Sequence, residues 1–330
     1  MFPTWLLVPF AVGLDRLIGD PAWIPHPVQI MGVVIRMLRT VAERCARDLP
    51  FRLRAAGLMI AGLLVGGAGW VGWLIEQLTL RSAWFGAPLM ALALASCLAL
   101  RSLDQAVRTV LQALPDLPLA RARLAWIVGR DVSALGEREI LRAVAETASE
   151  NAVDGVFAPL FWMIVGMAIW TLRPDAPGPL AMAWGFKAAS TLDSMLGYRT
   201  GTLRWLGTAG AKLDDVLTWI PCRLTALTLP LVAGEWRASM VQFAAATREG
   251  AADPSPNSGL SQAIYAQVVG IRMGGINRYG SELREKPLLA ADHPSPEAND
   301  VERILQLTRR LESAWVAVAC TMLLMLASWQ

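Results

Sequence analysis

Long apolar runs without charged side chains are the feature that most constrains what this chain can fold into. The longest, residues 55–75, contains no charge over 21 positions. A helix needs roughly 20 apolar residues to cross the hydrocarbon core of a bilayer. The chain is therefore predicted to be an all-α, polytopic integral membrane protein. The predicted spans are residues 2–14, 55–75, 83–100, 155–172, 216–234 and 314–329, of which the first is short enough to be either a tilted span or an interfacial helix.

The composition supports this fold class and excludes several others. Hydrophobic residues make up 55% of the chain and charged residues 17%, against about 25% charged residues in soluble domains. This balance excludes intrinsic disorder, which requires few apolar residues and a high charge. A net charge of +3 without a long basic block excludes a nucleic-acid binder. The four cysteines form no Cys-x-x-Cys pair, and two histidines are too few for a multi-histidine metal site.

Arginines are concentrated in two of the polar segments between the spans. Residues 15–54 and 101–154 carry seven arginines each, whereas residues 76–82 carry only Arg81. By the positive-inside rule, the two arginine-rich segments are predicted to lie in the cytoplasm. We expect one membrane domain over residues 1–330, with amphipathic cytoplasmic helices. The polar segments expected to carry the chemistry are 15–54, 101–154, 187–215 and 248–313.

A turn-rich segment follows the predicted span at 155–172. Residues 173–179 read Arg-Pro-Asp-Ala-Pro-Gly-Pro, which is typical of a tight turn, and a weaker apolar stretch follows at once. We therefore predict a helical hairpin over 155–190. Such a hairpin would return Lys187 to the side of the membrane from which the chain entered.

The first polar segment holds an aspartate and a histidine among prolines. Asp20 and His26 lie in the run Gly-Asp-Pro-Ala-Trp-Ile-Pro-His-Pro, in which the following proline holds His26 in extended backbone. One interpretation is a rigid loop that presents Asp20 and His26 to a ligand. The other is a turn beside the membrane with a capping aspartate, and both fit this pattern.

Residues 134–153 have the pattern of one amphipathic helix. Apolar residues repeat every four positions on one face, and Glu146, Glu150 and Asp154 do so on the opposite face. Three carboxylates on one stripe could hold Mg²⁺ through their oxygens. They could also form a solvated face that pairs with nearby arginines. Because the stripe runs into a membrane segment, where uncompensated acids are costly, the functional interpretation is favoured.

The segment 187–215 mixes cations and carboxylates. The mixture suits a phosphorylated substrate that is bound together with a metal ion. The alternative is a set of basic side chains that extend to the membrane interface and aspartates that cap helices. The candidate side chains are those of Lys187, Asp193, Arg199, Lys212, Asp214 and Asp215.

Further polar candidates lie in and before the segment 248–313. The run Asp-Pro-Ser-Pro-Asn-Ser-Gly is predicted to form a tight turn that ends near Asn257 and Ser258. Its backbone amides and hydroxyls could bind an anion, although an ordinary surface loop also fits. Arg223 lies inside an apolar run, where a charge is by default functional or paired. The chain contains no P-loop motif.

Seven motifs occur in order between Asp15 and Gly280. They read DRLIGDPAWIPHPV, GRDVSAL, ETASENAVDGVFAPLFW, KAASTLDSMLGYR, AGAKLDDVLTWIPCRLTAL, DPSPNSGLSQAIYA and RMGGINRYG. In sequence and order they resemble the CobD/CbiB family of cobalamin biosynthesis, the membrane-bound adenosylcobinamide-phosphate synthases. Several separate motifs in one order are far more specific than any one of them. The chain departs from the family pattern at Ser190, where asparagine is usual.

The resemblance implies an ATP-dependent, amide-forming ligase. In the family's reaction, a carboxylate of adenosylcobyric acid is joined to (R)-1-amino-2-propanol or its O-phosphate, which gives adenosylcobinamide or its phosphate. ATP is consumed as a co-substrate, and Mg²⁺ is needed. Because a carboxylate is inert toward amines at neutral pH, we expect ATP to convert it first to an acyl phosphate.

Roles for the candidate residues follow from this resemblance as hypotheses. His26 would be the general base for the amine, and Asp20 and Lys187 would be further catalytic groups. The metal ligands would be Glu146, Glu150, Asp154, Asp193, Asp214 and Asp215. The substrate and phosphate groups would be bound by Arg130, Asp131, Arg199, Lys212, Arg223, Asn257 and Ser258.

The resemblance also implies a cellular setting. The expected location is the bacterial inner membrane, with several spans and the active site on the cytoplasmic side. The expected partners are the corrinoid and aminopropanol substrates and the lipid bilayer, and no nucleic acid. Contact with later enzymes of the cobalamin pathway and self-association are compatible with this setting.

Three other functions compete with the ligase. A non-enzymatic membrane sensor, like the AmpE-type regulators, would not need so many ordered acids and bases. A Mg²⁺-dependent CDP-alcohol phosphotransferase would carry Asp-Gly, two residues and then Ala-Arg, whereas here Asp154-Gly155 precedes Val-Phe-Ala-Pro. A transporter would place its charges within the spans, whereas most charges here lie between them.

Overall fold

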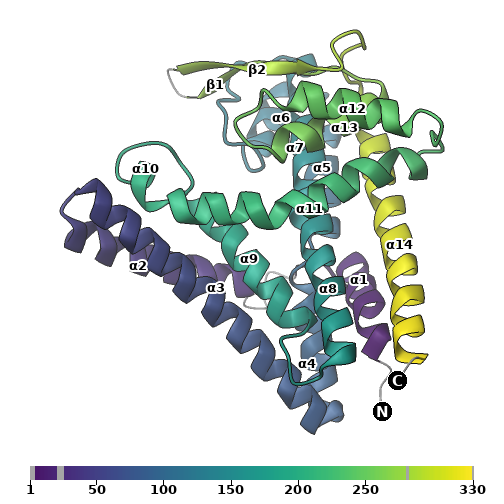
Figure 1. The fold of residues 1–330 in the computed structure, drawn as a ribbon. Helices are drawn as coiled ribbons and strands as arrows, with labels where there is room; N and C mark the ends of the chain where they lie inside the picture. The colour runs from purple at the N-terminus through teal and green to yellow at the C-terminus, as the bar shows by residue number, and fades with distance from the viewer. Residues whose placement is uncertain (1–3, 21–25, 280–281, 329–330) are drawn as a thin grey trace. The chain divides into compact units, whose positions relative to one another are not determined.

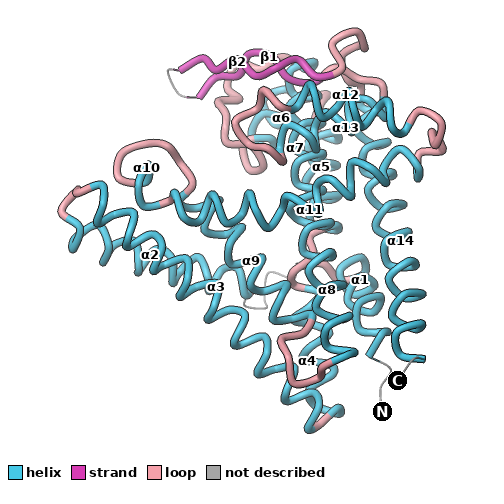
Figure 2. Tube along the Cα trace, in the orientation of Figure 1, coloured by secondary structure: helices cyan, strands magenta, loops and turns pink. Residues whose placement is uncertain are grey.

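The computed structural model of the chain describes residues 4–20, 26–279 and 282–328, and this part is almost entirely helical (Figure 1, Figure 2). This confirms the predicted all-α class. Within the described residues, the only sheet is an antiparallel hairpin of β1 (Met273–Tyr279) and β2 (Glu282–Leu289).

Contacts within the chain divide it into two compact units. Unit 1 comprises residues 1–99, 158–217 and 316–330, and unit 2 comprises residues 100–157 and 218–315. Two helices, α11 (Thr208–Val232) and α14 (Ala298–Ser328), contribute residues to both units. The single membrane domain expected from the sequence stays a prediction.

Five helical stretches in the described residues are long and apolar enough to cross a membrane. They overlap five of the six predicted spans and show a multi-pass membrane protein. Their bounds are Pro50–Arg81, Ala83–Gln112, Glu137–Leu172, Thr208–Val232 and Ala298–Ser328. The second stretch is interrupted by a turn between α4 (Ala83–Ala95) and α5 (Leu100–Gln112).

The predicted first span, residues 2–14, is not among these five stretches. Its described part forms a short 3₁₀ turn, η1 (Thr4–Leu6), and α1 (Leu7–Leu17). A helix of 11 residues is too short for a straight crossing. In unit 1, α1 packs against α4.

In unit 1, α2 (Pro27–Ala46) occupies half of the segment that the sequence predicted as a polar loop, 15–54. The helix begins there because Nδ1 of His26 accepts a hydrogen bond from the backbone N–H of Val28 at 3.2 Å, and Pro27 supplies a helical φ. It ends where Arg47 adopts a left-handed φ of 47°. An exposed apolar stripe, suited to contact with lipid, runs along α2 at helical spacing. Its members are Ile30, Val34, Met37 and Val41.

The predicted helical hairpin is present as α8 (Ala158–Leu172) and α9 (Pro179–Leu196). The two helices pack against each other, and α9 also packs against α3 (Pro50–Arg81), as Figure 1 shows. This contact is close because a Cβ atom on Gly72 would lie only 2.8 Å from the backbone of Ala181. Unit 1 is completed by α10 (Leu203–Leu206) and the first part of α11.

The carboxylate of Glu76 on α3 caps the N-terminus of α9. Its oxygens accept hydrogen bonds from the backbone N–H groups of Gly178, Leu180 and Ala181 at 2.8, 2.7 and 2.9 Å. The first N–H groups of a helix lack partners within the helix, and its positive dipole end attracts an anion. The fully buried Glu76 therefore anchors α9, the helix that carries Lys187, to α3.

We expect Glu76→Gln to destabilise the protein by about 1–3 kcal/mol, because the new amide N–H groups would face backbone N–H donors. Thermal unfolding in detergent, followed by circular dichroism, measures this change. Asp175→Asn is the control, since it removes an exposed carboxylate, 76% accessible, from the turn before α9. Equal unfolding temperatures for the two variants would contradict the capping role.

In unit 2, the predicted amphipathic helix over 134–153 is present as α7 (Glu137–Ala152). It begins near Gly136, whose backbone N–H donates a hydrogen bond to Oε2 of Glu139 at 2.9 Å. It continues through a π-helical turn, η2 (Val153–Phe157), and packs against α5, α6 (Leu117–Leu124) and α13 (Ser258–Val269). The carboxylate face of α7 is not fully solvated, because Glu146 is only 4% exposed.

The core of unit 2 is built around α13. The largest fully buried side chain is that of Tyr265, whose hydroxyl hydrogen-bonds with that of Thr308 at 2.7 Å. Burial raises the pKa of the Tyr265 phenol. The helix ends at Gly270, which adopts a left-handed φ of 80°, and the chain turns into β1. The helix α12 (Ser239–Gly250) packs against α13 and β2.

Candidate functional site

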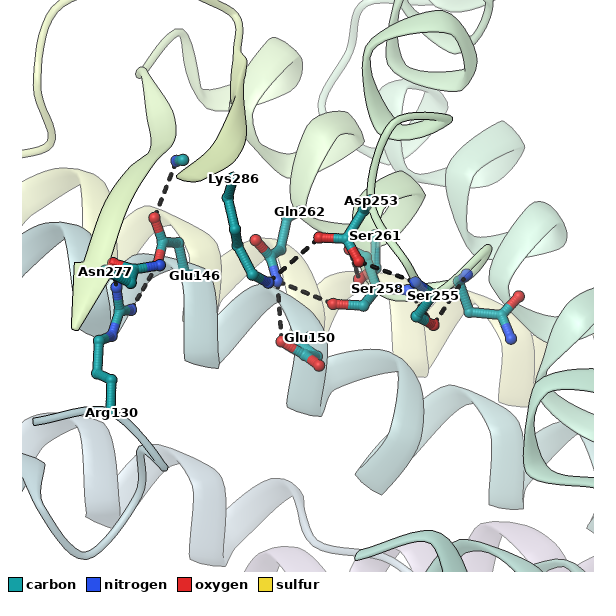
Figure 3. A network of polar contacts seen from close by, with 12 residues as sticks. Arg130, Glu146, Glu150, Asp253, Ser255, Ser258, Ser261, Gln262, Asn277 and Lys286 are labelled. Atoms are coloured by element: carbon teal, nitrogen blue, oxygen red, sulfur yellow. Dashed lines mark hydrogen bonds and ion pairs between the residues drawn. The ribbon is translucent and has the colours of Figure 1, made fainter. Parts of the chain in front are cut away.

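A buried ion pair lies at the centre of unit 2. Arg130 and Glu146 are joined by a salt bridge of 2.5 Å, with only 7% and 5% of their side chains exposed. Arg130 also donates a hydrogen bond to the side-chain oxygen of Asn277 on β1. Figure 3 shows the three side chains converging from a loop, from α7 and from the hairpin.

The same carboxylate holds the β-hairpin against α7. Its Oε1 accepts a hydrogen bond from the backbone N–H of Gly274 at 2.9 Å and faces Arg142 at 3.3 Å. Arg142 in turn donates to the carbonyl oxygens of Gly274 and Ile276. Gly274 must be glycine, because a Cβ atom would lie 1.9 Å from the carbonyl oxygen of Pro287. Both oxygens of Glu146 are therefore engaged, and the structure disfavours its predicted role as a metal ligand.

A second polar group surrounds the start of α13 (Figure 3). Nε2 of Gln262 donates to Oε2 of Glu150 at 2.8 Å and to Oγ of Ser258 at 3.0 Å. Asp253, in the loop before α13, forms an ion pair with Lys286 of β2 at 3.2 Å. These contacts join α7, α13 and the hairpin.

The turn before α13 was predicted to offer its amides to an anion. The backbone N–H of Ser255 donates to Asp253 at 3.0 Å, and those of Asn257 and Ser258 donate to Oγ of Ser255 at 3.4 and 3.3 Å. These amides are therefore used inside the turn. The anion-binding interpretation therefore loses these three amide donors and keeps only the hydroxyl groups of the turn.

Arg223 is held at the same turn by neutral groups. It donates to Oδ1 of Asn257 at 2.9 Å and to the carbonyl oxygen of Pro256 at 3.2 Å. Its guanidinium stacks on the ring of Trp219, 4.2 Å from the centroid. Beside it, Sγ of Cys222 donates to the carbonyl oxygen of Asn257 at 3.3 Å. These contacts fix the turn to α11.

The remaining acids of unit 2 have different surroundings. Asp154 lies in η2 and interacts electrostatically with Cys222. Asp131 accepts a hydrogen bond from the backbone N–H of Ser133 at 2.9 Å, and this bond holds the pKa of Asp131 below its ordinary value. Its own N–H donates to the carbonyl oxygen of Arg278 at 2.8 Å, which ties the loop to β1.

In unit 1, the side chains of Asp20 and His26 are in contact, while the loop predicted between them, residues 21–25, lies outside the described residues. Nε2 of His26 lies 3.1 Å from Oδ1 of Asp20, while Nδ1 accepts the N–H of Val28. In this arrangement Nε2 carries the proton, and the lone pair of Nδ1 is occupied. The predicted role as a general base is therefore disfavoured, and His26 serves as the N-cap of α2.

Asp214 of α11 lies within electrostatic range of Lys187 of α9 and of two further carboxylates of unit 1. Asp214 interacts electrostatically with Asp193, Asp215 and Lys187. No group of three or more His, Cys, Asp or Glu side chains in the described residues is arranged to hold a metal ion. Mg²⁺ usually takes one or two carboxylates and completes its shell with water and substrate phosphates. The aspartates beside Lys187 supply donors of that kind.

A cavity of about 600 Å³ lies between α2 and α9 in unit 1. A volume of a few hundred cubic ångströms is typical of small-molecule sites. Its polar lining side chains are those of Gln29, Arg36, Lys187, Ser190, Thr191 and Ser194.

The motifs of this chain match known proteins over most of its length. A family model described as CobD/Cbib protein matches residues 8–308. This chain belongs to the CobD/CbiB family. Cobalamin biosynthesis protein CobD of Synechocystis sp. is 43% identical over 279 residues, which cover 84% of this chain and 79% of that protein. Cobalamin biosynthesis protein CbiB of Salmonella typhimurium is 37% identical over 325 residues, which cover 96% and 94% of the two chains.

The relatives support a role for this CobD/CbiB member in cobalamin biosynthesis. A third relative, the CobD protein of Pelobacter propionicus, is 40% identical over 87% of this chain and 85% of its own length, and it carries the same description. No solved structure matches the chain significantly.

Two predicted phosphate-binding residues of this CobD/CbiB chain lie outside the polar groups described above. Arg199, after α9, and Lys212, on α11, are exposed, and neither lines the α2–α9 cavity. Conversely, three residues that line the cavity were not among the candidates predicted from the sequence, namely Gln29, Arg36 and Ser194. The available signal was the helical periodicity of 27–46, which would have placed Gln29 and Arg36 on one face of a helix.

Proposed function

We propose that this member of the CobD/CbiB family is an ATP- and Mg²⁺-dependent ligase. It joins a carboxylate of adenosylcobyric acid to (R)-1-amino-2-propanol or its O-phosphate. The observation that carries the proposal is the position of Lys187, which interacts with Asp214 and lines a cavity that also contains Arg36. Cations beside carboxylates are the groups that phosphoryl transfer requires.

The proposed reaction has two steps. A carboxylate oxygen of the corrinoid attacks the γ-phosphorus of ATP, which forms an acyl phosphate and releases ADP. The amine nitrogen then attacks the acyl carbon, a C–N bond forms, and the C–O bond to phosphate breaks. The amine proton passes to water or to a nearby carboxylate, since His26 has no available lone pair. Lys187 balances negative charge on the phosphoryl oxygens in the first step.

Asp214, with one of its neighbouring aspartates, would hold Mg²⁺, and water and substrate phosphates would complete the coordination of the ion. Asp193, Asp214 and Asp215 offer carboxylate oxygens, the donors that this ion prefers. When bound, Mg²⁺ would supply charge neutralisation for the phosphates of ATP. In unit 2, Glu150 accepts a bond from Gln262, and Glu146 is fully engaged, so α7 is the weaker candidate.

This assignment predicts that Asp214→Asn raises the Mg²⁺ concentration needed for half-maximal turnover by about tenfold, because one ligand charge is lost. Titration of activity with MgCl₂ at saturating ATP measures the effect. Glu150→Gln, in unit 2, is the comparison. A shift in Glu150→Gln with none in Asp214→Asn would return the metal site to α7.

The reaction itself is tested with the purified full chain in detergent. Mass spectrometry should detect adenosylcobinamide or its phosphate only when adenosylcobyric acid, the amine, ATP and Mg²⁺ are all present. Separate reactions with the free and the phosphorylated amine identify the second substrate. A membrane sensor would give no product under any of these conditions, and that result would overturn the proposal.

The proposal includes a location for the reaction. ATP is a cytoplasmic metabolite, and the arginine-rich segments of the chain follow the positive-inside rule. We therefore propose the bacterial inner membrane with the reacting groups on the cytoplasmic side. Ser194 is exposed, so Ser194→Cys in a variant without the four native cysteines, treated with a membrane-impermeant thiol reagent in vesicles of known orientation, tests the side.

A further inference from the structure

The cavity between α2 and α9 is lined by one face of each helix, and the lining residues follow the helical repeat. On α2, the polar lining residues Gln29 and Arg36 lie seven positions apart, on one helical face. On α9, Lys187, Ser190 and Ser194 also share one face. The two helices pack against each other, so these faces line one open cavity within unit 1, in which Arg36 is exposed.

The charged side chains that line this cavity are all positive. Arg36 and Lys187 are its two charged lining residues, and no acidic side chain among the described residues lines it. An arginine fork and a lysine ammonium are the cations that proteins use to bind phosphate oxygens. Asp214 offsets part of the Lys187 charge from outside the lining, so Arg36 carries the preference for an anion, and its paired donors favour a phosphate group.

The hydroxyl groups of the cavity indicate which hydrogen-bonding groups the rest of the ligand carries. Oγ1 of Thr191 donates to the carbonyl oxygen of Lys187 at 2.6 Å, and Oγ of Ser194 donates to that of Ser190 at 2.9 Å. Their protons are used inside α9, so both hydroxyls present lone pairs. A ligand that carries N–H or O–H donors as well as a phosphate would use both sets.

We infer that the α2–α9 cavity binds the phosphate ester of a small molecule that also carries hydroxyl or amine donors, with Arg36 as a binding residue. The inference rests on the proposed function for its two candidate ligands, ATP and the O-phosphate of (R)-1-amino-2-propanol. Both carry this chemistry.

The test is equilibrium binding to the purified full chain in detergent, without corrinoid and therefore without turnover. Isothermal titration calorimetry with ATP, with the amine phosphate and with inorganic phosphate gives one dissociation constant for each probe. Arg36→Gln should lower the affinity for the phosphate ester at least about tenfold, because a charge-assisted hydrogen bond is lost. Arg36→Lys should recover only part of the affinity, because lysine keeps the charge and lacks the paired donors. Arg44→Gln is the matched control, since Arg44 is exposed on the same helix and does not line the cavity.

Each outcome has one meaning. Tighter binding of ATP, lost in Arg36→Gln, assigns the cavity to the nucleotide, and tighter binding of the amine phosphate assigns it to the amine. Equal affinities in Arg36→Gln and wild type, or no binding of any probe by the wild type, overturn the inference. If the wild type forms product but Arg36→Gln binds every probe as tightly as the wild type, the ligase proposal stands and the binding site is wrong. If binding depends on Arg36 but no product forms, the binding site stands and the ligase proposal is wrong.

Discussion

Replacing Lys187 with methionine is expected to lower the rate of amide formation about a hundred- to a thousandfold, the size of effect seen when one charge-stabilising donor is removed. Methionine keeps the length and the apolar stem of the side chain but removes the ammonium. Lys187 lines the α2–α9 cavity and interacts with Asp214, so its charge acts where phosphoryl oxygens would lie. Initial rates of product formation, measured by mass spectrometry, give the effect.

Two comparisons make the Lys187 result interpretable. Arg44→Gln removes a cation from exposed α2 outside the cavity and is expected to keep the wild-type rate. The unfolding temperature of Lys187→Met should match that of the wild type, because the side chain is only half-buried. A wild-type rate in Lys187→Met would move the phosphoryl transfer away from this cavity.

Replacing Glu146 with glutamine is expected to lower the free energy of unfolding by about 3–5 kcal/mol, because it leaves buried guanidinium charge without a partner. Arg130, at 7% exposure, forms its ion pair with this carboxylate. The hairpin would also lose its contact, since the N–H of Gly274 donates to Glu146. Thermal unfolding in detergent, followed by tryptophan fluorescence, measures the loss.

Glu137→Gln is the matched control for Glu146→Gln. Glu137 is exposed in the first turn of the same helix, so its replacement should cost less than about 1 kcal/mol. If Glu146 were instead a metal ligand, its replacement would leave the stability without Mg²⁺ unchanged and raise the Mg²⁺ requirement. That pattern would contradict the structural role assigned here.

Much of the fold could be predicted because membrane spans are local signals. An uncharged run such as 55–75 is long enough by itself to indicate a helix, and α3 contains it. The turn composition at 173–179 likewise predicted the α8–α9 hairpin. No helix was predicted by residue range within 15–54, where the structure has α2, because an amphipathic helix carries polar residues on one face and leaves no long uncharged run.

The candidate site could be predicted only in part. The motifs predicted Lys187, Asp214 and Glu146 as site residues, and all three have charged neighbours in the structure. The sequence could not separate their roles, because a carboxylate that binds a metal and one that binds an arginine have the same pattern. It also missed Arg36, whose importance arises only from the packing of α2 against α9.

The sequence by itself determined the class of this protein and its family, since run length, charge distribution and motif order need no knowledge of contacts between distant residues. The tertiary structure decided which groups are available for chemistry. In the fold, Glu146 forms an ion pair with Arg130, and Nδ1 of His26 accepts a hydrogen bond from the N–H of Val28. Lys187, by contrast, lines a cavity. The physical reason is that an ionisable group is defined by its partners, and those partners come from segments far apart in the chain.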